Sequence, residues 1–281
     1  MYDLKIVDES FDLNLASEYH LSIQVGLDGF SFCILDKRKI KYIAFRHIPL
    51  IVGKMQFLSR KVEAIFEQEE MLNAAFGSVS VTYSTNKATL VPKEYSDPSF
   101  SHQLAGLTSN INRSEEVTIN NLHGSNYQLI FSFPKELLAV FNRKYTEFSF
   151  IHKTIPLLAT VLLQLNEKRN TLMINFEKKY IRMIAMKGSE ISLYNSFYYK
   201  NESDFLYYTL NICHTLQINP EFDEILVGGY IASDSVYIRQ LKKYFGNIHF
   251  LAPFSDYNYG NLFDKIQKHQ FVSLLNTYPC V

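Results

Sequence analysis

The side chains that could do chemistry are spread along the chain and form no complete catalytic motif. Eight histidines occur without an HxH or HExxH pattern, no serine lies in a GxSxG segment, and no GxxxxGK[ST] loop is present. A two-metal nuclease would need clustered carboxylates, one of them on the first strand. The early acids Asp28 and Asp36 fall in predicted turns instead. The pattern therefore argues against a nuclease, a zinc peptidase and a P-loop enzyme.

Two glycine-containing segments are better candidates for contact with a ligand. Gly26 and Gly29 flank Leu27-Asp28, and Asp28-Gly29 is also the commonest kind of tight hairpin turn. Gly228-Gly229 follows a short apolar strand and precedes a predicted helix over 234–245, whose N-terminus would favour an anion. A Gly-Gly pair after a strand can also serve only for close packing. Both interpretations stay open for each segment.

Composition indicates a folded protein with a large core. The 281 residues carry 28 basic and 28 acidic side chains, no Trp, 22 Phe and 19 Tyr, and 47% of them are hydrophobic. This length predicts two domains. The zero net charge argues against a general nucleic-acid binder, which needs a basic surplus. Eleven glycines are few for an enzyme with several phosphate loops.

The cysteines and the apolar segments predict a soluble, cytoplasmic protein. Cys33, Cys213 and Cys280 are scattered and form no CxxC pair, which is typical of reduced thiols. The polar residues 1–5 do not resemble a signal peptide. The longest apolar run, 155–165, is shorter than the roughly 20 residues that cross a bilayer. We expect no membrane span.

Apolar periodicity divides the chain into two halves with one order of elements: strand, strand, strand, helix, strand. The first half has predicted strands over 20–26, 30–35, 40–45 and 79–83 and a helix over 54–70. The second has strands over 171–176, 180–186, 191–199 and 224–227 and a helix over 203–216 with Ser203 as its N-cap. A helix over 134–145 and an apolar helix over 154–166 lie between the halves, each after a strand, and 248–251 is a last strand. Residues 85–125 predict a loop-rich connection or a small inserted element.

This order predicts an α/β protein with mixed sheets covered by helices. It is the ribonuclease H-like plan, and two copies form the actin-like fold. We predict an N-terminal lobe over 1–150, which includes the insert at about 85–125, and a C-terminal lobe over 151–281.

The chain resembles the actin-like ATPase superfamily, and within it the scaffold proteins of type IV pili, type II secretion and cell division. It resembles still more a poorly characterised bacterial family of this fold that has no established function. Four segments carry that closer likeness: Thr89–Pro92, Asn195–Tyr199, Asp204–Tyr208 and Phe271–Val281.

The resemblance implies three nucleotide-binding segments, and the first departs from the pattern. Gln24 stands where the superfamily has an aspartate that holds the water shell of Mg²⁺. Gly26 and Gly29 remain, but Asp28 adds negative charge where phosphate would lie. A neutral amide does not replace a carboxylate around a divalent cation.

The second segment also departs from the pattern, whereas the third matches it. Asn175 stands for the second aspartate, and Glu177 stands for a glycine that would let backbone N–H groups approach phosphate. Lys178 and Lys179 could compensate or could form an ordinary charged turn. Gly228-Gly229 matches the adenosine loop.

We therefore predict a non-catalytic interaction or scaffold module with a degenerate nucleotide cleft, no metal site and no cofactor beyond weakly bound ATP with Mg²⁺. The candidate nucleotide-contacting residues are Gly26, Asp28, Gly29, Asn175, Lys178, Gly228 and Gly229. The alternatives are a weak ATPase or sugar-kinase-like phosphotransferase, and a binder of another small molecule in the same cleft. The resemblance implies a protein partner of unknown identity.

Two further features bear on that partner. Tyr198-Tyr199 and Tyr207-Tyr208 belong to the core or, if exposed together, to a partner surface. The tail that begins at Phe271 is apolar enough to dock on the second lobe or on a partner.

Overall fold

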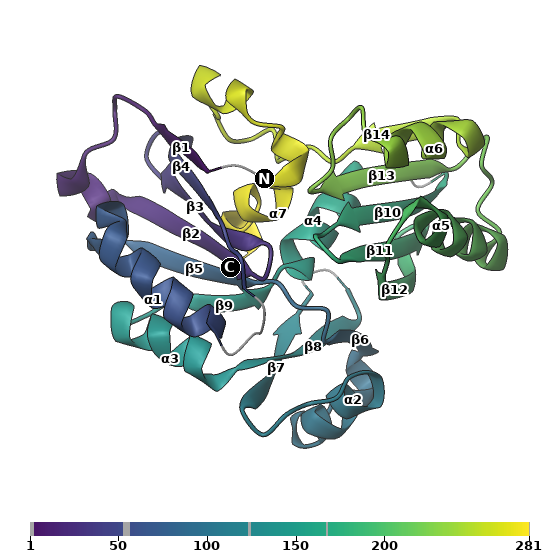
Figure 1. Cartoon of the computed structure of the whole chain (residues 1–281), viewed down its shortest axis with the longest axis horizontal. Coiled ribbons are helices and arrows are strands. Elements are labelled where there is room, and N and C mark those ends of the chain that lie inside the picture. The colour runs from purple at the N-terminus through teal and green to yellow at the C-terminus, as the bar shows by residue number, and fades with distance from the viewer. Residues whose placement is uncertain (1–2, 53–56, 123–124, 167, 281) are drawn as a thin grey trace. The chain divides into compact units, whose positions relative to one another are not determined.

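The computed structural model describes residues 3–52, 57–122, 125–166 and 168–280, and divides the chain into two compact units. Unit 1 contains Met1–Pro156, Phe254–Ile266 and Ser273–Val281, and unit 2 contains Leu157–Pro253 and Gln267–Val272. The main division between the units falls between Pro156 and Leu157, and two late segments belong to unit 1. Figure 1 shows the elements of both units.

Unit 1 is built on a six-stranded mixed sheet of order β1-β4-β3-β2-β5-β9. Its strands are β1 (Leu4–Val7), β2 (Tyr19–Gly26), β3 (Gly29–Asp36), β4 (Lys41–Pro49), β5 (Ser78–Tyr83) and β9 (Ser149–His152). The predicted meander is confirmed, since β2, β3 and β4 pair antiparallel in sequence. β5 lies parallel to β2, and β9 parallel to β5. β1 was not predicted, because it has only four residues and just one of them is buried.

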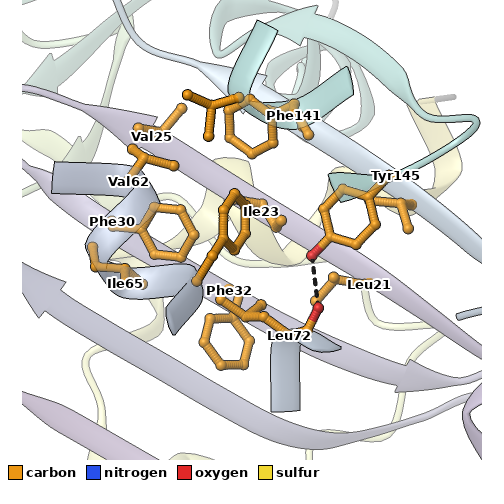
Figure 2. Packing of buried hydrophobic residues seen from close by; sticks show 14 of the residues in the cluster. Leu21, Ile23, Val25, Phe30, Phe32, Val62, Ile65, Leu72, Phe141 and Tyr145 are labelled. Carbon is orange, nitrogen blue, oxygen red and sulfur yellow. Dashed lines mark hydrogen bonds between the residues drawn. The ribbon is translucent and has the colours of Figure 1, made fainter. Parts of the chain in front are cut away.

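Helices α1 (Leu58–Gln68) and α3 (Lys135–Lys144) cover one face of this sheet (Figure 1). Residues 54–56 of the predicted first helix lie outside the described residues. Figure 2 shows the apolar core between helices and sheet, with Phe141 of α3 near Val25 of β2. Tyr145 donates from its hydroxyl to the carbonyl oxygen of Leu72 at 3.2 Å, which satisfies the polar end of a buried ring (Figure 2).

The C-terminal tail packs on the sheet of unit 1, which corrects the prediction that it docks on the second lobe or on a partner. It contains α7 (Val272–Leu275). The carbonyl oxygens of Leu274 and Leu275 accept hydrogen bonds from Cys33 and Tyr42, both in strands of unit 1. The first two residues of the tail, Phe271 and Val272, belong to unit 2. There the ring centroid of Phe271 lies 6.1 Å from that of Tyr230.

The segment predicted as a loop-rich connection or a small inserted element belongs to a small subdomain, which agrees with the second alternative. Its elements are β6 (Ala88–Pro92), α2 (Ser101–Thr108), β7 (Glu115–Asn121) and β8 (Tyr127–Pro134). The strands form an antiparallel sheet of order β6-β8-β7, and its small core centres on Val91, Ala105 and Ile130. Most positions of β6 and β7 are only half-buried, so polar residues are tolerated there and the apolar pattern is weak.

Unit 2 is built on a five-stranded sheet of order β12-β11-β10-β13-β14. Its elements are α4 (Thr154–Gln164, whose first residues belong to unit 1), β10 (Asn170–Phe176), β11 (Tyr180–Lys187), β12 (Glu190–Tyr198), α5 (Glu202–Leu216), β13 (Glu224–Gly229), α6 (Val236–Tyr244) and β14 (Asn247–Phe250). The N-cap of α5 is Asn201, whose side chain accepts from the backbone N–H of Asp204 at 3.0 Å, and not Ser203 as predicted. Short 3₁₀ turns complete the chain at Leu13–Glu18, Glu70–Asn73, Lys93–Tyr95, Pro98–Phe100, Asn261–Lys265, Lys268–Gln270 and Tyr278–Cys280.

The two sheets repeat one topology down to the register of single residues. Strands β4-β3-β2-β5-β9 and β12-β11-β10-β13-β14 have the same order and the same directions. Gln24 pairs with Ser31, three residues before the irregularity at Ile34/Leu35. Asn175 pairs with Arg182, three residues before the matching irregularity at Ala185/Met186. Gln24 and Asn175 therefore occupy equivalent positions.

Candidate functional site

The first candidate segment, in unit 1, has its key amide bound internally. Gln24 is buried near the end of β2, beside Thr82 of β5. Its Oε1 accepts a hydrogen bond from the hydroxyl of Ser273 at 2.5 Å, and Ser273 is buried as well. Thr82 and Thr277 lie 3.1 Å apart through their hydroxyl oxygens. The C-terminal tail thus covers this end of β2 with matched polar contacts.

The predicted hairpin turn is confirmed at Leu27-Asp28, between the paired residues Gly26 and Gly29. Neither glycine has a positive φ, so the backbone does not require them for conformation. Close packing does require them. A Cβ on Gly26 would lie 2.9 Å from the Cβ of Ser84, and a Cβ on Gly29 would lie 2.7 Å from Cε1 of His47. Both glycines therefore have a packing role in unit 1.

The second candidate segment, in unit 2, is a buried ionic cluster. Oε1 of Glu177 lies 3.3 Å from Nη1 of Arg182 and accepts from Nδ2 of Asn175 at 3.4 Å. Nε of Arg182 donates to the hydroxyl of Ser196 at 3.4 Å. Asn175, Glu177 and Arg182 are all buried, as buried charges usually are only when paired. Lys178 and Lys179 follow as exposed residues of the turn.

Arg182 is the residue that the sequence prediction missed. The one available signal is its place in the segment Tyr180–Met186, where it is the only charge among apolar residues. A charge at an interior strand position implies a buried partner. Which acid provides it depends on the antiparallel register of β10 and β11, which brings Asn175 opposite Arg182.

The third candidate segment has a glycine that its backbone requires. Gly229 ends β13 with φ +79°, and a Cβ there would overlap the carbonyl oxygen of Phe176 and lie 2.8 Å from Oδ1 of Asn175. At Gly228 a Cβ would meet Cδ1 of Leu251 at 2.7 Å. Helix α6 begins two residues later than the predicted 234, and its N-cap Ser235 accepts from the backbone N–H of Ile238 at 3.3 Å.

The structure thus brings Asn175, Gly228 and Gly229 together at the ends of two parallel strands of unit 2. Gly26, Asp28 and Gly29 lie together in a hairpin of unit 1. Across the described residues, no group of three or more His, Cys, Asp or Glu side chains could hold a metal ion. No helix in the described part of the chain is long and apolar enough to cross a membrane.

The tyrosine pairs divide between the core and the surface. Tyr199 and Tyr208 pack against the core of unit 2, where the ring of Tyr208 stacks on Phe197 at 4.7 Å. Tyr198 is 48% exposed and Tyr207 is 65% exposed. One member of each pair is therefore available at the surface.

Comparison with solved structures identifies the fold. A Bacteroides thetaiotaomicron protein described as having an actin-like ATPase fold and unknown function superimposes with a TM-score of 0.78, at 22% identity over 86% of this chain and 93% of the other. The PilM–PilN type IV pilus biogenesis complex gives a TM-score of 0.56, at 10% identity over 93% and 98%. The ethanolamine utilization protein EutJ of Carboxydothermus hydrogenoformans gives a TM-score of 0.53, at 8% identity over 96% of this chain and 91% of the other.

The chain therefore has the actin-like ATPase fold, as predicted. No match was found among functionally curated proteins. The model of a family described as "Protein of unknown function (DUF3822)" matches residues 8–248, and this chain belongs to that family.

Proposed function

We propose that this protein is a non-catalytic interaction module of the cytoplasm, with an actin-like frame whose nucleotide-binding segments have lost the groups that hold Mg-nucleotide. Its three cysteines are unpaired, which suits a reducing compartment.

The observation that carries the proposal is the pair of amides at equivalent positions. Actin-like enzymes would need carboxylates there for the water shell of Mg²⁺, a cation that prefers anionic oxygen ligands. Gln24 and Asn175 are neutral, buried and hydrogen-bonded inside their own units, to Ser273 and Glu177. Recruiting Oε1 of Gln24 to a metal would break its buried hydrogen bond from Ser273, at a cost of about 1–3 kcal/mol.

The ion pair of unit 2 supports the same conclusion. Glu177 stands where a phosphate-binding glycine would be, and its side chain blocks the approach of phosphate to the backbone N–H groups. Nη1 of Arg182 lies 3.3 Å from Oε1 of Glu177, so this buried arginine is paired inside unit 2. The glycines of the first and third segments have packing roles of their own and do not by themselves imply a ligand.

Support for a protein partner comes by analogy. The PilM–PilN structure, to which this chain is similar in fold, is described as a type IV pilus biogenesis complex. By analogy with that complex, we infer that a protein is the partner of this chain.

The test is calorimetric titration of the purified chain with Mg-ATP, together with a phosphate-release assay. We expect no heat of binding at micromolar ATP and no phosphate release above the buffer rate. Gln24→Ala should behave like the unaltered chain in both assays. Tight binding with turnover that Gln24→Ala abolishes would overturn the proposal in favour of an ATPase or phosphotransferase.

A further inference from the structure

A hollow opens in the small subdomain of unit 1, beside helix α2, which packs on the three-stranded sheet (Figure 1). Its walls come from residues 102–115, which form α2, the following loop and the start of β7, and from Lys135 at the start of α3. Its volume is about 890 Å³, within the range of roughly 300–1,000 Å³ that is usual for small-molecule sites. None of the candidate nucleotide-contacting residues lines it, so it is a separate place on the molecule.

Positive charge prevails on the walls of this hollow. Arg113 and Lys135 line it as exposed residues, and His102 adds an imidazole ring. Neither Arg113 nor Lys135 forms an ion pair with another described residue. The one acid among the described lining residues is Glu115, whose two carboxylate oxygens accept hydrogen bonds from Nζ of Lys87 at 2.9 and 2.7 Å. Because Lys87 compensates Glu115, the charges of the two exposed cations remain to attract an anion.

Hydrogen bonds fix the walls of the hollow relative to one another. Nζ of Lys87, besides its bonds to Glu115, donates to the carbonyl oxygen of Asn110 at 2.7 Å and so holds the loop after α2. The N–H of Lys135 donates to the carbonyl oxygen of Ser114 at 3.0 Å, which ties the start of α3 to the same loop. A site that is formed before its ligand arrives loses less conformational freedom when the ligand binds.

Gly106 is a glycine that the fold does not require. It lies inside α2, where glycine destabilises a helix relative to alanine. Its φ is not positive, and nothing lies within 4 Å of the position that its Cβ would take. Gly106 follows His102 by four residues, so the two share one face of the helix, and both line the hollow. A side chain at position 106 would therefore extend into the hollow, and the glycine keeps that space open.

We propose that this hollow binds a small sugar phosphate, with the phosphate group at Arg113 and Lys135. A guanidinium group binds phosphate through two parallel N–H bonds, and an ammonium group adds a point charge. The uncharged side chains of the walls suit the hydroxyl groups of a sugar, because they both donate and accept hydrogen bonds: Thr108, Ser109, Asn110 and Asn112. Among the described lining residues there is no Phe, Tyr or Trp ring on which a nucleobase would stack, so the lining favours a sugar phosphate over a nucleotide.

The first experiment is calorimetric titration of the full-length chain with glucose 6-phosphate, ribose 5-phosphate and glycerol 3-phosphate. Each is compared with its unphosphorylated counterpart and with inorganic phosphate at one ionic strength. We expect at least one of the three to bind with a Kd below about 1 mM. Its unphosphorylated counterpart should bind at least about tenfold more weakly, because it lacks the charge. Inorganic phosphate should also bind more weakly, because it leaves the hydroxyl and amide groups of the walls without a ligand.

A second experiment locates the binding with variants of the same helix and loop. Arg113→Gln and Gly106→Leu should each weaken the sugar phosphate about tenfold, the first by removing a charge and the second by filling the hollow. Leucine is a better helix former than glycine, so thermal unfolding of Gly106→Leu should show no loss of stability. The matched control is Gln103→Leu, which also places a leucine on α2 but at an exposed position that does not line the hollow. It should bind the sugar phosphate as the unaltered chain does.

The inference would be overturned if none of the three sugar phosphates bound below about 1 mM, or if inorganic phosphate bound as tightly as all of them. Binding that Arg113→Gln leaves unchanged, or that Gly106→Leu and Gln103→Leu weaken equally, would overturn it as well. The inference does not depend on the proposed function. Turnover of ATP that Gln24→Ala abolishes would refute the proposed function and leave this site standing, whereas loss of this site would leave the amides at Gln24 and Asn175 as they are.

Discussion

Gly229 should not tolerate even a methyl side chain, and the reason can be separated into two parts. Its φ of +79° lies in the left-handed region, where an L-residue costs roughly 1–2 kcal/mol. In addition, a Cβ there would overlap the backbone carbonyl oxygen of Phe176 and lie 2.8 Å from its nitrogen. Backbone atoms cannot rotate away as a side chain can, and overpacking of this kind typically costs about 1–3 kcal/mol. Gly229→Ala should therefore destabilise unit 2 by about 3 kcal/mol.

Gly188→Ala is the matched control in the same unit. Gly188 also has a positive φ, +56°, but nothing lies within 4 Å of its Cβ position. It should lose only the conformational part, about 1 kcal/mol. The contrast between the two variants isolates the steric part of the cost at Gly229.

The assay is urea unfolding followed by far-UV circular dichroism, with the free energy of unfolding extrapolated to water. The expected order of stability is unaltered chain, Gly188→Ala, Gly229→Ala. If Gly229→Ala lay within about 0.5 kcal/mol of Gly188→Ala, the steric argument would be refuted. Packing would then not explain why position 229 is a glycine, and contact with a ligand would become the better explanation for Gly228-Gly229.

Two further predictions concern unit 1. Burial, with a smaller contribution from Lys37, lowers the pKa of His20 to about 3. Between pH 6.5 and 3 the unfolded chain therefore binds a proton at His20 that the folded chain does not. The free energy of unfolding should fall as the pH drops through this range. The loss should approach about 1.4 kcal/mol per pH unit, and His20→Asn, which can keep the bond to Ser78, should flatten the slope of unfolding free energy against pH; an unchanged slope would contradict the assignment. Ser273→Ala should cost about 1–3 kcal/mol in urea unfolding, because it removes the hydroxyl donor from buried Oε1 of Gln24. Thr277→Ser, which keeps its hydroxyl, should cost less, and equal costs would argue against that account.

The sequence predicted the sheets well where the apolar pattern was strong. The strands of both meanders appear within a few residues of their predicted limits, because each packs apolar residues of one face against a core. β1, β6 and β7 were missed, because they are short or half-buried and the pattern that marks a strand is weak. β8 was predicted, as the strand before the helix over 134–145, and five of its eight residues are buried.

The candidate sites depended on information that lies outside any local pattern. The amides Gln24 and Asn175 were recognised from a resemblance, but their hydrogen-bond partners were not. Ser273 lies far along the chain from Gln24, in a tail that was predicted to dock on the second lobe or on a partner. Arg182 meets Glu177 only through the register of β10 and β11.

The helix cap was a closer choice. Asn201 and Ser203 are both good cap residues, and the path of the chain out of β12 selected Asn201. Local propensity ranks the candidate cap residues, but it does not determine where the preceding strand ends and the helix begins.

The most direct test of the central claim is the dependence of ATP affinity on Mg²⁺, measured by titration with excess Mg²⁺ and again with EDTA. If the amides at Gln24 and Asn175 have removed the metal-binding chemistry, the two titrations should give the same weak affinity or none. The variant Gln24→Asp/Asn175→Asp is the positive control for a gain of Mg²⁺ dependence. An affinity of the unaltered chain that rises tenfold or more with Mg²⁺, about 1.4 kcal/mol, would contradict the account.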